Sequence, residues 1–351
     1  MTRLRDHYET VRRRNDYDPV DGAVGPLDAG QRRRFVAVDD PGVLRREPSD
    51  ATLVSTGVGM TGSPHLGTVG QILTAVEYQR AGLDVQFVTA DLEPYHGGAP
   101  LDEVQKLAER YRSFCLDLGF DPERGRLRTQ SDALDVMQTA QLLAPCYDPE
   151  SWNDGDRPPT EWEQAVEATY EAPSDERPEG EGGTVTFEGP TSEAATTHSA
   201  VLHGVDFLHP LYAGEYDRLV LSFGVDEHHL TSMARRFRDA ASVDGAVAGL
   251  YTRMLPGFDG APKMSKSIPG SGIPLDMAPA AIRERIDGDG GGDPAASPVF
   301  QAMCLASRYE ADRLDRIAAA CERGDGEWDR AKGEYAEFVV DLAEQWQGTA
   351  E

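Results

Sequence analysis

The sequence has few cysteines and no long apolar stretch. Of its 351 residues only four are cysteine, and they lie far apart without a CxxC pair, so neither a disulfide framework nor a zinc knuckle is indicated. No run approaches about 18 uncharged apolar residues, so no membrane-spanning helix is predicted. The N-terminus carries arginines instead of an apolar signal core, and a cytoplasmic location is therefore expected.

Lysine is also scarce. The chain has 34 basic residues and a net charge of −27, but only four of its residues are lysine: Lys106, Lys263, Lys266 and Lys332. In molar salt the Debye length falls to about 3 Å, so the self-repulsion of an acidic surface is screened. We interpret the composition as adaptation to a salt-rich cytoplasm; an acidic protein that binds cationic partners is the alternative.

Apolar periodicity predicts alternating strands and helices early in the chain. Residues 51–55 and 85–90 are short apolar runs typical of buried strands, and 69–80 and 101–118 have the apolar spacing of helices. This order favours a parallel sheet covered by helices. We predict an α/β fold, a doubly wound parallel sheet of the Rossmann-like type, with ligands at the carboxyl ends of its strands.

Composition divides the chain into three parts. We predict an N-terminal extension with one amphipathic helix over 1–50, the Rossmann-like catalytic domain over 51–275 and a smaller helical C-terminal domain over 276–351. Within the catalytic domain, residues 148–193 are rich in acids, proline and glycine. A segment of that composition buries little, so we predict a mobile acidic insertion.

A glycine-rich turn follows the first predicted strand. Residues 57–62 spell GxGxxG, the pattern of a dinucleotide-binding turn. However, Pro64 falls where the helix of such a turn should already have begun. Asp84, the acid at the spacing expected for ribose binding, precedes the second strand instead of following it. A nicotinamide-dependent enzyme is therefore disfavoured.

A histidine and a glycine lie at the same strand-to-helix junction, in the sequence SPHLGT at residues 63–68. Gly67 lets a nucleotide approach the backbone, and the helix N-terminus together with the His65 imidazole can face phosphates. The alternative is an ordinary capped helix with a histidine that faces solvent.

The strongest signal is the sequence KMSKS at residues 263–267. Two of the four lysines, Lys263 and Lys266, stand here among hydroxyl residues, in a loop bounded by Pro262 and Pro269. Lysine ammonium groups can neutralise the charge that develops on a departing pyrophosphate. In a chain with so few lysines, this placement favours a loop that folds over a triphosphate.

These segments together resemble the class I aminoacyl-tRNA synthetases. HLGT at 65–68 and KMSKS at 263–267 are similar to the HIGH and KMSKS signatures of that family. The segments VLHGVD at 201–206 and GVDE at 224–227 look like the PxLQAAD helix and the GxDQ turn of its tryptophanyl/tyrosyl branch. The chain looks most like the tryptophanyl form, from a halophilic archaeon.

The resemblance implies a role for each matching residue. Four residues would be catalytic at the ATP phosphates: His65, Thr68, Lys263 and Lys266. The other ATP-binding residues would be Gly57, Gly67, Gly224, Asp226, Met264, Ser265 and Ser267, with Asp226 on the ribose hydroxyls. The amino-acid pocket would contain Thr56, Asp91, His203 and Asp206. In that pocket Asp206 would accept a hydrogen bond from the polar atom of an aromatic side chain.

The implied reaction is attack of an amino-acid carboxylate on the α-phosphate of ATP, followed by transfer of the acyl group to tRNA. No protein nucleophile is needed, because positioning and electrostatics lower the barrier while Mg²⁺ bridges the phosphates. The partners implied are tRNA and a small amino acid, and the branch implies a homodimer. No metal site made by the protein is predicted.

Three departures from the family pattern leave the substrate open. Thr68 replaces the second histidine of HIGH, His203 the glutamine of the QAAD helix, and Glu227 the glutamine of GxDQ. Ser55 stands where tyrosyl enzymes usually have tyrosine, which favours tryptophan. The alternatives are a tyrosyl ligase, an adenylate-forming enzyme that does not use tRNA, and a silent paralogue that binds RNA or a protein.

Overall fold

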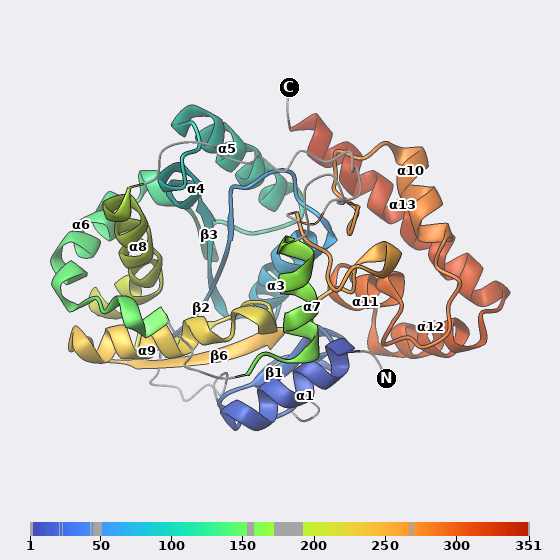
Figure 1. Cartoon of the computed structure of the whole chain (residues 1–351), viewed down its shortest axis with the longest axis horizontal. Coiled ribbons are helices and arrows are strands. Elements are labelled where there is room, and N and C mark those ends of the chain that lie inside the picture. The colour runs from blue at the N-terminus through green and yellow to red at the C-terminus, as the bar shows by residue number, and fades with distance from the viewer. Residues whose placement is uncertain are drawn as a thin grey trace.

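A six-stranded sheet runs through the centre of the molecule (Figure 1). The computed structural model describes residues 3–20, 22, 24–42, 44, 51–152, 158–171, 192–266, 268 and 270–349. The strand order is β1-β6-β5-β2-β3-β4, and all neighbours except β1 and β6 are parallel. The parallel strands are β2 (Thr52–Gly59), β3 (Asp84–Ala90), β4 (Gly125–Thr129), β5 (Arg218–Leu221) and β6 (Ala246–Thr252).

Two apolar cores lie on opposite faces of the sheet. Helices α3 (Leu66–Arg80) and α5 (Leu101–Asp117) cover one face; α6 (Leu134–Leu143), α8 (Glu193–Tyr212) and α9 (His229–Ala240) cover the other. Adjacent residues of one strand enter different cores, as Leu53 and Val54 do in β2. Continuous apolar runs are expected for parallel strands that are buried on both faces. The doubly wound prediction is confirmed.

The order of the parallel strands reverses at the centre of the sheet. From β2 the chain proceeds outward to β3 and β4, then returns to place β5 and β6 on the other side of β2. The carboxyl ends of β2 and β5 therefore form a topological switch point, where proteins of this architecture bind ligands.

Residues 1–50 contribute more to the fold than a single helix. They form α1 (Arg3–Asn15), α2 (Ala29–Arg32) and the strand β1 (Phe35–Val38), which pairs antiparallel with β6. Arg34 is buried and donates hydrogen bonds to the carbonyls of Leu305 and Ser307. The N-terminal part is thereby tied to the C-terminal helices. The four apolar residues 35–38, which stand between three arginines and two aspartates, were too short a run to predict this strand.

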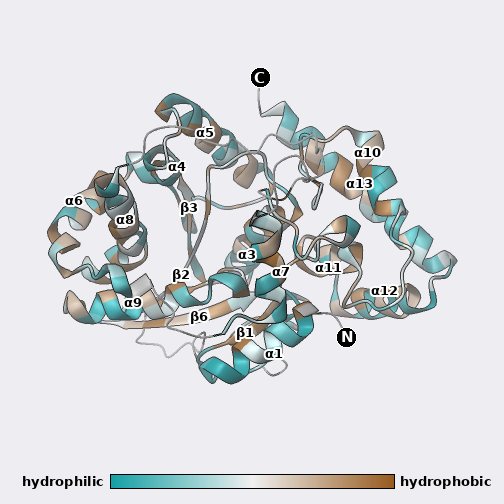
Figure 2. Ribbon diagram, in the orientation of Figure 1, coloured by the Kyte–Doolittle hydropathy of each residue, from teal (hydrophilic) through white to brown (hydrophobic). Residues whose placement is uncertain are grey.

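The C-terminal part is helical and shares one core with the sheet. It comprises α10 (Pro279–Asp287), α11 (Pro298–Leu305), α12 (Ala311–Arg323) and α13 (Gly326–Gly348). Trp346 of α13 packs on Tyr111 and Phe114 of α5, with ring centroids 5.0 and 5.6 Å apart. In Figure 2 strand β6 is coloured largely apolar, whereas α1 is largely hydrophilic. Within the described ranges, no helix is long and apolar enough to cross a membrane.

The acidic insertion contains an ordered helix, α7 (Glu161–Glu171). The expectation that this segment buries little is wrong for α7, because Trp162 is only 3% exposed. The backbone N–H of Thr160 donates to Glu163 Oε2 at 2.6 Å, and the Glu163 N–H donates to Thr160 Oγ1 at 3.2 Å. This reciprocal pair is a capping box, which stabilises a helix start even in an acidic segment.

Candidate active site

Helix α3 begins at the carboxyl end of β2, and His65 is its N-cap residue. The Nδ1 atom of His65 accepts hydrogen bonds from the backbone N–H groups of Gly67, at 2.9 Å, and Thr68, at 3.3 Å. A Cβ atom on residue 67 would lie 2.6 Å from Cε1 of the imidazole, so only glycine lets the ring lie across the first turn. The histidine and glycine of the HLGT sequence therefore act together.

The imidazole of His65 stays neutral in this environment. Its pKa is lowered to about 3, first by burial and then by the positive charges of Lys266 and Lys263. A neutral ring can keep accepting the backbone hydrogen bonds of the helix start. The positive charges of both lysines of the 263–267 loop therefore act on the first turn of α3.

Lys263 forms an ion pair with the ribose-binding candidate Asp226. Its Nζ atom lies 3.1 Å from Oδ2 of Asp226, which belongs to the turn η4 (Val225–Glu227) after β5. Burial favours the neutral amine, but the carboxylate outweighs it and raises the pKa of Lys263 above its usual value. Gly224 is needed in this turn, because a Cβ there would lie 2.5 Å from Oδ1 of Asp226.

Lys266 lies against a tyrosine that the sequence patterns did not single out. Its Nζ atom donates to the hydroxyl oxygen of Tyr111 at 3.0 Å, and that hydroxyl donates to the carbonyl of Gly62 at 2.9 Å. Burial lowers the pKa of Lys266 to about 7. Tyr111 occupies an ordinary core position of α5, so only the fold reveals its contact with the loop.

The other loop residues hold the backbone in place. Met264 is buried, and its N–H donates to the carbonyl of Leu255 at 2.8 Å. A Cβ on Gly272 would lie 2.6 Å from Met264 Cγ, so the methionine packs directly on that glycine. The N–H of Ser265 donates to the hydroxyl of a serine six residues later, at 3.0 Å. Ser267 lies outside the described residues.

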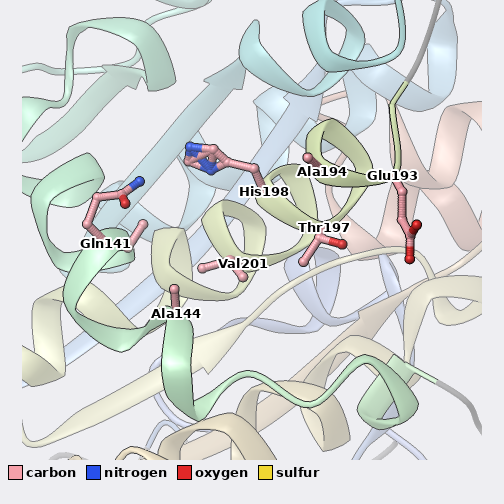
Figure 3. A pocket seen from close by; sticks show the side chains of 8 residues that line it. Gln141, Ala144, Glu193, Ala194, Thr197, His198 and Val201 are labelled. Atoms are coloured by element: carbon pink, nitrogen blue, oxygen red, sulfur yellow. The ribbon is translucent and has the colours of Figure 1, made fainter.

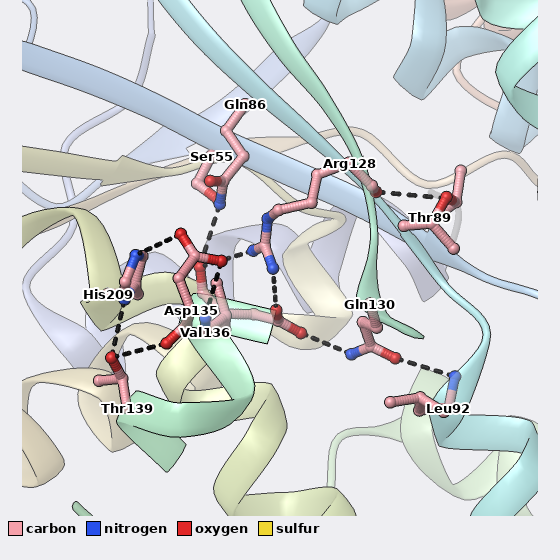
Figure 4. A network of polar contacts seen from close by, with 12 residues as sticks. Ser55, Gln86, Thr89, Leu92, Arg128, Gln130, Asp135, Val136, Thr139 and His209 are labelled. Atoms are coloured by element: carbon pink, nitrogen blue, oxygen red, sulfur yellow. Dashed lines mark hydrogen bonds and ion pairs between the residues drawn. The ribbon is translucent and has the colours of Figure 1, made fainter. Parts of the chain in front are cut away.

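Asp206 belongs to a buried polar network on the other side of the sheet's carboxyl end. One carboxylate oxygen lies 2.7 Å from Nη1 of Arg128, and the other accepts from Nε2 of Gln130. The side chain of Gln86 also donates to the backbone carbonyl of Asp206, at 3.0 Å. Figure 4 shows Arg128 and Gln130 converging from β4 and the turn that follows it. The carboxylate expected to select the substrate is therefore already paired within the protein.

Three further residues expected at the site make contacts at the carboxyl end of the sheet. Asp91 is fully buried and accepts from both the N–H and the hydroxyl of Ser131, which joins the ends of β3 and β4. Thr56 Oγ1 and the carbonyl of Gly57 both accept from Nε2 of Gln71 in α3, at 3.2 and 2.6 Å. These contacts shape the end of the sheet and leave no described side-chain oxygen of Asp91 without a donor.

Glu93, which the sequence patterns missed, lies near two of the substituted positions. It belongs to α4 (Leu92–His96), directly after β3, and its Oε2 atom lies 3.9 Å from Nδ1 of His203. Desolvation raises the pKa of Glu227 to about 8, with further contributions from the charges of Asp226 and Glu93. An acid just past a strand's carboxyl end was the available signal for Glu93.

With this geometry, the chain can be compared with known proteins. Residues 48–148 match the family model described as tRNA synthetases class I (W and Y), a range that includes His65 and ends before Lys263. In that segment the chain is similar to the class I tRNA synthetases. No curated protein sequence matches the chain significantly. The resemblance to the W and Y branch is thereby confirmed, whereas a halophilic source stays a prediction.

Solved structures share the synthetase fold over nearly the whole chain. Tryptophanyl-tRNA synthetase from Aeropyrum pernix K1 aligns with a TM-score of 0.70 at 19% identity, covering 98% of this chain and 94% of that one. A tryptophanyl-tRNA synthetase homolog from Entamoeba histolytica gives 0.71 at 14%, covering 99% and 94%. Tyrosyl-tRNA synthetase from Archaeoglobus fulgidus, complexed with L-tyrosine, gives 0.62 at 18%, covering 93% and 100%. At these identities the likeness concerns the fold.

One open pocket of this synthetase fold lies apart from the lysine loop. Figure 3 shows it between α6 and α8, with Gln141, Thr197 and His198 on its walls and a volume of about 560 Å³. None of the residues predicted for the site lines it. Among the described residues, no group of three or more histidine, cysteine, aspartate or glutamate side chains is arranged to hold a metal ion.

Proposed function

We propose that this chain is a tryptophan–tRNA ligase, which activates tryptophan with ATP and transfers it to tRNA in the cytoplasm. The observation that carries the proposal is that Lys263 is bonded to Asp226, while Lys266 is bonded to Tyr111, whose hydroxyl donates to the carbonyl of Gly62 just before the N-cap of α3. Two ammonium groups beside a helix N-terminus suit a triphosphate, because both features favour negative charge.

In the proposed reaction the amino-acid carboxylate attacks the α-phosphate of ATP, forming the aminoacyl-adenylate and releasing pyrophosphate. Lys263 and Lys266 would neutralise charge that grows on the phosphates, while the neutral His65 keeps the first turn of α3 in place. Binding of ATP would also bring the ribose to Asp226, which then exchanges its bond with Lys263 for bonds to hydroxyls. Catalysis would rest on positioning and electrostatics, without a protein nucleophile.

The residues present fit a Mg²⁺ ion that arrives with the nucleotide. Such an ion is usually held by substrate phosphates and only one or two protein carboxylates. Glu227 and Glu93 would provide these, because they follow the carboxyl ends of the parallel strands β5 and β3. When bound, the ion would neutralise phosphate charge.

Two observations support tryptophan as the substrate: the sequence of the strand and turn at residues 55–57, and the tryptophanyl enzymes among the similar solved structures. Ser55 occupies the position that carries tyrosine in tyrosyl enzymes. Tryptophanyl enzymes and a tryptophanyl homolog also recur among the similar structures, with TM-scores from 0.63 to 0.71. Because Asp206 is paired with Arg128, we propose that His203 and Glu93 contribute to side-chain selection in its place.

We also propose a homodimer. Leu134 and Leu142 of α6 are 73% and 58% exposed, although both are large apolar side chains. Large apolar side chains that are exposed at both ends of one helix would be buried against a partner. A second copy of the chain is the partner that the family resemblance implies.

Amino-acid-dependent exchange of pyrophosphate into ATP, in molar KCl with Mg²⁺ and across all twenty amino acids, tests the activation step. Exchange with tryptophan alone is expected, and K266A should abolish most of it while K106A, at a 73% exposed lysine, should not. Exchange with tyrosine would select the tyrosyl alternative. Exchange without tRNA charging would indicate an adenylate-forming enzyme, and no exchange a silent paralogue.

A further inference from the structure

Helix α7 of the acidic insertion lies directly against the start of the 263–267 loop. In Figure 1 it stands next to α1 and in front of α3. The indole Nε1 of Trp162 donates a hydrogen bond to the carbonyl of Pro262 at 2.9 Å, and Trp162 is 3% exposed. Pro262 is the residue immediately before Lys263, so this bond fixes the backbone at the point where the loop begins.

The N-terminal helix holds α7 in this position. The ring of His7, in α1, lies 4.4 Å from the ring of Trp162, and its Nδ1 atom is 3.0 Å from Oγ1 of Thr160. Thr160 is also the residue that forms the capping box of α7 with Glu163. The first turn of α7, which contains Trp162, is therefore held by His7 near the N-terminus of the chain.

A second contact joins the far end of α7 to the loop. The hydroxyl of Tyr170 lies 3.4 Å from Oγ of Ser265, and Nζ of Lys263 lies 6.0 Å from the centre of the Tyr170 ring. Trp162 and Tyr170 are separated by eight residues, or about 12 Å of helix. The loop is thus contacted by α7 at two points, while Leu255 holds Met264 from the core side.

We propose that Trp162 is a positioning residue for the activation step. By fixing the Pro262 carbonyl it sets the direction in which the loop leaves the core, and with it the places of the Lys263 and Lys266 ammonium groups. A loop without this bond would have to be ordered by ATP at the expense of transition-state stabilisation. The catalytic consequence rests on the proposed function, but the ordering of the loop by α7 does not.

Trp162→Phe tests the proposal, because phenylalanine keeps an aromatic ring against His7 but cannot donate to Pro262. The chain offers a matched control in Trp328, which is 1% exposed and donates its indole N–H to the carbonyl of Asp289 at 3.2 Å. Each variant loses one buried indole hydrogen bond. Only the first loses it at the loop.

Two readouts separate positioning from general destabilisation. We expect W162F to lower kcat for ATP–pyrophosphate exchange about five- to tenfold relative to W328F, the change expected from one lost hydrogen bond. The dissociation constant for tryptophan alone should stay unchanged. Amide hydrogen exchange in a peptide covering 258–272 should become faster in W162F and stay at the wild-type rate in W328F.

The proposal is overturned if W162F and W328F behave alike in both measurements. If none of the twenty amino acids supports pyrophosphate exchange by the unmodified protein, the proposed function fails. Amide hydrogen exchange at the 263–267 loop then still decides whether α7 orders this loop. If W162F does not fold, Tyr170→Phe replaces it, with Tyr212→Phe as the control at a similarly exposed tyrosine. Faster amide hydrogen exchange of the loop in Y170F but not in Y212F supports the proposal, and equal exchange rates in the two variants refute it.

Discussion

The affinity for ATP should fall as the pH rises through 7, because Lys266 loses its proton there. Burial lowers the pKa of this lysine to about 7 in the free protein. A bound triphosphate stabilises the charged form, so it raises that pKa and binding takes up a proton above pH 7. Below pH 7 the lysine is already charged, and affinity should no longer depend on its titration.

The size of the effect follows from the charged fraction. With a pKa near 7, about nine tenths of the Lys266 side chains are charged at pH 6 and about one tenth at pH 8. If only the charged form binds, the dissociation constant rises about tenfold over this range, or about 1.4 kcal/mol. Isothermal titration calorimetry in buffers with different ionisation enthalpies measures both the affinity and the proton uptake.

Lys266→Arg is the decisive variant, because arginine keeps its charge throughout this range. The fall in affinity and the proton uptake should both be smaller in K266R. When the measurement is made without Mg²⁺, Glu227 also titrates, with a pKa of about 8, and its negative charge would weaken ATP binding. Glu227→Gln removes that contribution, so the comparison is best made in the E227Q background. An unchanged pH dependence in K266R would refute the role assigned to Lys266.

Two further predictions concern buried charges. Arg128→Met should lower the free energy of unfolding by about 3–5 kcal/mol, because it leaves the Asp206 carboxylate buried without its counter-charge; urea denaturation would reveal it, and a loss below 1 kcal/mol would contradict the pairing. Lys332→Met should lower the free energy of unfolding by about 2 kcal/mol, because it removes a donor from two carbonyls at 3.0 and 2.8 Å. Lys106→Met, at an exposed ion pair, should lower it by under about 0.5 kcal/mol. Equal denaturation midpoints for the two lysine variants would show that the buried ammonium contributes nothing.

The parts of the fold that sequence reasoning predicted are those with strong local signals. The helices now seen at Leu66–Arg80 and Leu101–Asp117 had clear apolar spacing, and the strands beside them were continuous apolar runs. The strand Phe35–Val38 had no such signal, because it depends on pairing with β6, which lies more than 200 residues away. Helix α7 did have one, the Thr160–Glu163 capping box, but it was hidden by the acidic composition around it.

The site was predictable where a residue type is tied to a backbone shape. His65 and Gly67 could be placed because a helix start after a strand is legible in sequence. The partner of Asp206 could not be predicted, because Arg128 comes from a strand 78 residues earlier and only the register of the sheet brings it near. Motif similarity placed Asp206 on the right helix and said nothing about what had already paired with it.

The positions of the four lysines indicate where this chain uses lysine in place of arginine. Arginine replaces lysine at low cost on a solvated surface, but its planar fork fits less well where a compact ammonium is enclosed. Lys332 is 5% exposed and donates to two backbone carbonyls at the end of α10, and Lys263 and Lys266 lie within the loop beside α3. Only Lys106, of the four, sits in an exposed pair. In a chain whose basic residues are nearly all arginine, three of the four lysines therefore occupy confined sites, and the two that lie within four residues indicate a site for concentrated negative charge.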